Sequence, residues 1–83
     1  MASLSIKKEE KLIALTAAKE DFERDLYKTF VKLGLNPDTY DMDDFEFDAD
    51  VPLDEQDADY LLQKHADMLI QRLEKISDKI AEL

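Results

Sequence analysis

Carboxylates are the groups with chemical potential that this 83-residue chain concentrates most strongly. Eleven of its 21 Asp and Glu residues lie between Asp38 and Asp59, and no Lys or Arg interrupts that stretch. The formal net charge is −10, whereas outside the stretch acids and bases nearly cancel. Carboxylates at this density could bind a divalent cation, transfer protons, or attract a basic partner.

The spacing of these acids does not fit a calcium loop. An EF-hand requires oxygen ligands at positions 1, 3, 5, 9 and 12, with glycine at position 6. Frames that begin at Asp41, Asp43 or Asp48 have neither the glycine nor the final glutamate. We therefore expect no dedicated metal site and no cofactor, and only loose divalent binding remains as an alternative.

Other catalytic groups are scarce in the sequence. His65 is the single histidine, cysteine is absent, and one glycine cannot build a phosphate-binding loop. Paired carboxylates act as acid and base only when the walls of a pocket perturb them differently. A chain of this size has little material for such walls, so we expect no catalytic residues and no enzyme activity.

A helix is predicted for residues 5–33. Its apolar residues recur at spacings of three and four, which places them on one helical stripe: Leu12, Leu15, Ala18, Phe22, Leu26, Phe30 and Leu33. Gly34, followed by Leu35 and Pro37, marks the end of this helix. We expect Gly34 in the left-handed conformation that commonly terminates helices, with Leu35 as its hydrophobic companion.

A second helix is predicted for residues 54–83, with Asp54 or Asp57 as its N-cap. Apolar residues follow an unbroken a/d repeat from Leu62 to Leu83, as in a coiled coil. We interpret part of this repeat as a candidate oligomer interface, formed by Leu62, Leu69, Leu73, Ile76 and Ile80.

The connection between the helices, residues 35–53, is too long for a simple turn. From Asp44 to Leu53 acidic and apolar residues alternate. If the segment is extended, Phe45, Phe47, Ala49, Val51 and Leu53 share one side and the acids share the other. Two phenylalanines in register favour an ordered segment over a disordered tether.

These elements predict a single all-α domain over residues 1–83, in which a helical hairpin carries an extended acidic connector. Chains this small seldom bury enough apolar surface alone, so we expect a homodimer that forms a dimeric helical bundle. Without cysteine, a secretory leader or an apolar span, the sequence favours a cytoplasmic protein that does not bind membranes. Its acidity argues against direct contact with nucleic acid.

The hypothesis that follows is a non-enzymatic protein whose connector docks on a basic surface of a partner protein and inhibits or regulates it. The expected partner-binding residues are Asp41, Asp43, Asp44, Phe45, Glu46, Phe47, Asp48 and Asp50. A special case is partial nucleic-acid mimicry, with a nucleic-acid-binding protein as partner, and phage products often have this build. Two alternatives remain: a solvated linker that covers the hairpin with its apolar side, and an assembly component that works through its helices.

Overall fold

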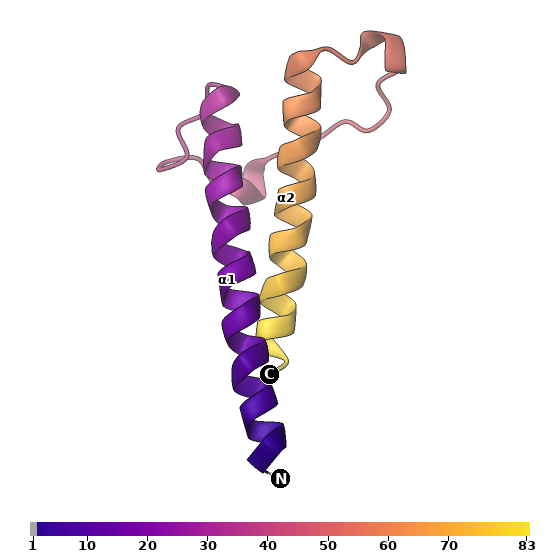
Figure 1. Cartoon of the computed structure of the whole chain (residues 1–83). Coiled ribbons are helices and arrows are strands. Elements are labelled where there is room, and N and C mark those ends of the chain that lie inside the picture. The colour runs from indigo at the N-terminus through magenta and orange to yellow at the C-terminus, as the bar shows by residue number, and fades with distance from the viewer. Residues whose placement is uncertain (1) are drawn as a thin grey trace.

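The computed structural model describes residues 2–83, with side chains described from Lys7 onward. Helix α1 (Ala2–Lys32) and helix α2 (Ala58–Ala81) pack against each other in opposite directions, so both termini lie at one end of the hairpin (Figure 1). The connector contains two short 3-10 helices, η1 (Met42–Asp44) and η2 (Leu53–Glu55). The described residues contain no strand, which confirms the prediction of an all-helical hairpin.

The molecule is elongated. Its radius of gyration is 16.1 Å, whereas a compact chain of this length has a value of about 12 Å. Helix α1 is the longer helix, with 31 residues against 24 in α2, and its N-terminal end extends past the C-terminus of the chain (Figure 1). No helix among the described residues has an apolar run long enough to cross a membrane.

The end of α1 forms as the sequence predicts. Gly34 has a φ of +81°, and it is the single residue with a positive φ in the described backbone. The Leu35 N–H donates to the Phe30 carbonyl at 3.0 Å, and the Gly34 N–H donates to the Val31 carbonyl at 3.1 Å. These two bonds make a Schellman motif. Leu35 then packs on the hydrophobic core, which directs the connector back over the hairpin.

Helix α2 begins four residues later than predicted. The Asp57 side chain caps it by accepting a hydrogen bond from the Tyr60 N–H at 2.8 Å. Asp54, the other candidate cap, lies in η2 instead. Gln56 separates the two helical segments because its backbone is extended, with φ −80° and ψ 98°.

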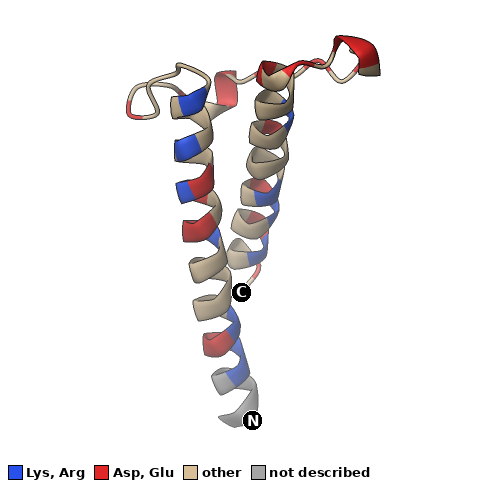
Figure 2. Ribbon diagram, turned by 45° about the horizontal axis from the view of Figure 1, so that its top comes forward, with Lys and Arg blue, Asp and Glu red and all other residues tan. Residues whose placement is uncertain are grey.

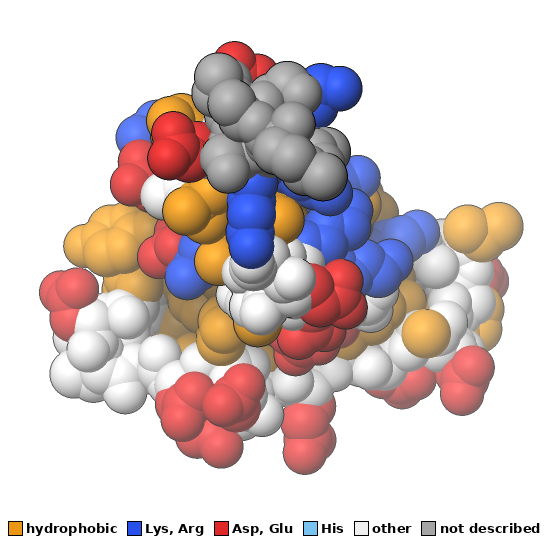
Figure 3. All heavy atoms as spheres, turned by 90° about the horizontal axis from the view of Figure 1, so that it is seen from below, with side chains coloured by type: hydrophobic (Ala, Val, Ile, Leu, Met, Phe, Trp, Pro, Cys, Tyr) orange, Lys and Arg blue, Asp and Glu red, His pale blue; other side chains and the backbone are white. Residues whose placement is uncertain are grey.

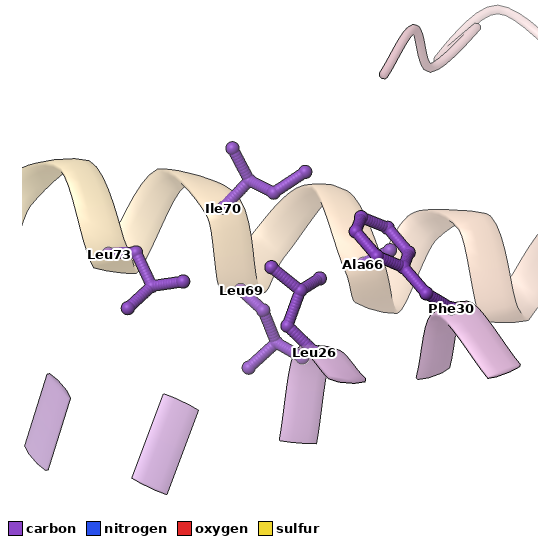
Figure 4. Packing of buried hydrophobic residues seen from close by; sticks show 6 residues of the cluster. All are labelled: Leu26, Phe30, Ala66, Leu69, Ile70 and Leu73. Atoms are coloured by element: carbon purple, nitrogen blue, oxygen red, sulfur yellow. The ribbon is translucent and has the colours of Figure 1, made fainter. Parts of the chain in front are cut away.

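Six buried side chains from both helices form the core (Figure 4): Leu26, Phe30, Ala66, Leu69, Ile70 and Leu73. The a/d repeat of α2 therefore supplies the internal seam of one chain. Of the residues predicted as an oligomer interface, Leu69, Leu73 and Ile76 are buried within the chain. The other two, Leu62 and Ile80, are half-buried.

The connector corrects the prediction of a continuous extended strip. Asp44 belongs to η1, and the chain turns at Asp48–Asp50, where the Asp50 N–H donates to Asp48 Oδ1 at 2.9 Å. Because this turn breaks the alternation, Ala49 is exposed and Leu53 is 86% exposed. A short side chain that accepts a hydrogen bond two residues on is an Asx turn, and it competes with extended structure here.

Replacement of Leu69, which is 2% exposed, by alanine should lower the free energy of unfolding by about 3 kcal/mol, because a buried cavity forms. Chemical denaturation followed by circular dichroism measures the change. Met68→Ala is the matched control, since its side chain is 38% exposed, and it should cost no more than about 0.5 kcal/mol. Equal losses at the two positions would contradict the packing described here.

Candidate functional site

The eleven acids between Asp38 and Asp59 form what we call the acidic edge. All eleven are exposed, and they gather at the end of the hairpin opposite the termini (Figure 2). The six predicted partner-binding acids belong to it: Asp41, Asp43, Asp44, Glu46, Asp48 and Asp50. The structure therefore brings the predicted acids together on one surface.

The two predicted phenylalanines point toward the hairpin. Phe45 lies against Phe30, with ring centroids 5.8 Å apart, and it packs on the core. Phe47 lies against Tyr60 at 5.2 Å. Both rings are half-buried. This arrangement matches the alternative in which the apolar side of the connector covers the hairpin and the acids face water.

Two hydrogen bonds fix the acidic edge to the region around the start of α2. The Tyr60 hydroxyl donates to the Asp48 carbonyl at 3.0 Å, and Gln56 Nε2 donates to the Val51 carbonyl at 3.1 Å. Reasoning from sequence did not single out Gln56, and it gave Tyr60 only a place at an interface rim. Their partners are backbone carbonyls, which leave no signature in residue type or spacing.

Three acids of the edge also shape the backbone. Asp41 and Asp48 each accept a hydrogen bond from the amide two residues on, and Asp57 caps α2. The other edge carboxylates have no hydrogen-bond or ion-pair partner in the described part of the chain. The one ion pair there joins Arg24 to Asp21 at 3.5 Å, and it lies within α1.

The charges are therefore segregated. Seen along the hairpin from the end with the termini, Lys and Arg side chains gather mainly on one side and acids line the opposite margin (Figure 3). Two carboxylates about 7 Å apart in water repel by roughly 0.6 kcal/mol. Because no base neutralises the edge, this repulsion persists until counterions or a cationic partner relieve it.

An open groove of about 430 Å³ lies beside the edge, between α1, the start of the connector and α2. Its floor is apolar, with Leu26, Phe30 and Leu73, and its charged residues are Lys19, Glu23 and Asp41. No group of three His, Cys, Asp or Glu side chains among the described residues could hold a metal ion. The groove is thus suited to contact with apolar side chains.

No family model, curated protein or solved structure matches this chain. The physical properties of the acidic edge and of the helices must therefore carry any statement about function. The edge combines dense, unpaired charge with an anchored backbone, which is an arrangement suited to binding.

Loss of the Tyr60 hydroxyl should loosen the acidic edge. Tyr60→Phe removes the bond to the Asp48 carbonyl, which is worth about 1 kcal/mol, so amide exchange at Asp50 and its neighbours should rise roughly fivefold. Hydrogen exchange followed by NMR measures this rate. Tyr27→Phe, at a side chain that is 49% exposed, is the control and should leave the connector unchanged. Identical exchange in both variants would show that the hydroxyl does not anchor the edge.

Proposed function

We propose that this protein is a small non-enzymatic binding module that presents its acidic edge to a basic surface of a partner protein. By covering that surface, the module inhibits or regulates the partner. The observation that carries the proposal is that all eleven edge acids are exposed, with no base among them. Opposite charge on a partner relieves the repulsion within the edge and steers the encounter.

The anchored backbone supports this function energetically. A flexible acidic tether loses conformational entropy when it binds, about 1–2 kcal/mol for each residue whose backbone is fixed. Here Phe45, Phe47 and the Tyr60 hydroxyl already hold the connector on the hairpin. Part of the ordering cost is therefore met during folding, which favours affinity.

The proposal assigns the partner contacts to the carboxylates and gives Phe45 and Phe47 a supporting role. For a phenylalanine to enter a pocket of the partner, its ring would have to leave Phe30 or Tyr60. That exchange removes one apolar contact for each one it makes. Carboxylates that already face water need no such rearrangement.

Charge density gives partial support to nucleic-acid mimicry. The molecule is 27 Å wide along its second axis and carries eleven acids at one end, whereas duplex DNA carries about sixteen charges over that length. The folded connector thus approaches the charge density of DNA more closely than an extended strip would. A basic nucleic-acid-binding cleft is accordingly one kind of partner surface within the proposal.

A second candidate function is assembly through the helices, with a homodimer as its simplest form. The accessible surface is 6360 Å², about 1,300 Å² above the roughly 5,100 Å² typical of a folded chain of this mass. A standard interface buries about 800 Å² on each partner. The excess is large enough for one such interface.

Neutralising part of the edge should abolish partner binding. In the quadruple variant Asp44→Asn, Glu46→Gln, Asp48→Asn and Asp50→Asn, four exposed charges disappear while residue size is kept. With about 0.5 kcal/mol for each exposed charge contact, affinity for a purified basic partner should fall about 30-fold. Affinity purification identifies the partner, and calorimetric titration measures the change.

The matched control removes four charges elsewhere: Glu9→Gln, Glu10→Gln, Glu74→Gln and Asp78→Asn. These acids are exposed on the two helices, so the net charge changes equally while the edge stays intact. The control should bind like the original chain, and binding should be lost near 0.5 M salt, where exposed charge contacts are screened. Equal losses in both variants would reduce the edge to a contribution of net charge alone, and unchanged binding by the edge variant would overturn the proposal.

A further inference from the structure

The outer face of α1, which points away from α2, carries an apolar repeat that the hairpin does not use. Six residues recur at spacings of four and three: Ile13, Ala17, Glu20, Arg24, Tyr27 and Val31. All six are exposed, and Ile13, Tyr27 and Val31 are 70%, 49% and 54% exposed. At 3.6 residues per turn they form one stripe, which we call the outer stripe, on the side of α1 roughly opposite its buried Leu26.

The outer stripe is self-complementary when it is read in the antiparallel direction. Its six members form three pairs, each centred on position 22: Ile13 with Val31, Ala17 with Tyr27, and Glu20 with Arg24. The outermost pair joins two apolar residues, the second joins a small residue to a large one, and the innermost joins opposite charges. A two-fold axis at position 22 creates every pair twice, as a closed dimer requires.

We propose that the outer stripe is the docking surface for a second copy of this chain, with the two α1 helices antiparallel. The proposal rests on the assembly candidate above and does not depend on the acidic edge. It differs from the interface expected from sequence, because the repeat of α2 is already buried inside one chain. The surplus accessible surface exceeds what one partner buries in a standard interface.

The charged pair gives the dimer its direction. In a parallel pair Glu20 would meet Glu20 and Arg24 would meet Arg24, whereas the antiparallel pair brings opposite charges together. Arg24 can make this contact because its present ion pair with Asp21 is weak, at 3.5 Å with side chains 66% and 71% exposed. Polar residues within an apolar seam commonly specify register in this way.

Repulsion between copies keeps the dimer reversible. Each chain carries a net charge of −10, and Asp21 and Glu23 flank the two-fold axis in both copies. We therefore expect salt to strengthen the dimer, because it screens these like charges. Binding to a basic partner through the acidic edge has the opposite salt dependence, which separates the two contacts.

The antiparallel arrangement also fixes where the acidic edges lie. Residue 8 of one α1 is level with residue 36 of the other, so equivalent ends of the two helices are about 40 Å apart at 1.5 Å per residue. The two edges then lie at opposite ends of the dimer. Such a particle could engage two basic surfaces at once, which raises its avidity when both sites are within reach.

Sedimentation equilibrium of the full-length chain over a range of concentrations tests the proposal. We expect a monomer–dimer equilibrium for the original sequence. Ile13→Asp removes two apolar contacts from each dimer and should weaken association about 100-fold. Leu61→Asp is the matched control, because Leu61 is 53% exposed on α2, outside the outer stripe, and it should leave the dimer unchanged. Circular dichroism shows that each variant remains helical.

Charge exchange tests the pairing directly. Glu20→Arg and Arg24→Glu should each weaken the homodimer about tenfold, because each places like charges opposite one another. An equimolar mixture of the two single variants should regain the affinity of the original chain, and so should the double variant Glu20→Arg with Arg24→Glu. Recovery in these two samples requires Glu20 and Arg24 to be partners across the interface.

Orientation is measured with a spin label on a cysteine introduced by Lys8→Cys, since the chain has no cysteine of its own. The two labels should be about 40 Å apart in the antiparallel dimer. A separation below about 20 Å would show parallel helices and overturn the proposed register. A chain that remains monomeric at its highest soluble concentration overturns both the stripe and the homodimer. A dimer that resists Ile13→Asp overturns the stripe but leaves assembly through another face intact.

Discussion

Phe30 is the contact on which both the hairpin and the connector depend. Its side chain is 3% exposed and packs in the core that α1 forms with α2. The connector reaches the same ring from outside, through Tyr40 at 5.3 Å and Phe45 at 5.8 Å. Its carbonyl also accepts the hydrogen bond that closes α1. One residue thus joins helix pairing, helix termination and the return of the acidic segment.

This arrangement resolves a conflict between charge and order. Eleven exposed acids without a neutralising base favour an expanded connector, because like charges separate when the backbone allows it. Apolar contacts at Tyr40, Phe45 and Phe47 oppose that expansion and keep the segment on the hairpin. Burial of an aromatic ring stabilises by about 1.5–3 kcal/mol, which exceeds the screened repulsion of several carboxylate pairs.

The sequence predicts the regular elements because their signals are local. The spacing of apolar residues defines both helices, and Gly34 marks the end of α1 with its positive φ. The connector was less predictable, because alternation from Asp44 onward implies a strip only while the backbone stays extended. The turn at Asp48–Asp50 breaks it, and the bond from Tyr60 that anchors this turn spans twelve residues. Such a contact depends on where the folded hairpin places Tyr60, which local spacing does not encode.

The same distinction explains why the acidic edge was foreseen while its support was not. Acids remain exposed in almost any fold, since burying a carboxylate is costly, so their position in the sequence already predicts surface charge. The role of Phe45 and Phe47 depends on whether an apolar surface lies within reach. The hairpin supplies one through Phe30 and Tyr60, so the rings become part of the protein before any partner arrives. A fixed, charged surface can then distinguish partners by the position of their basic groups, which a mobile tether could do only weakly.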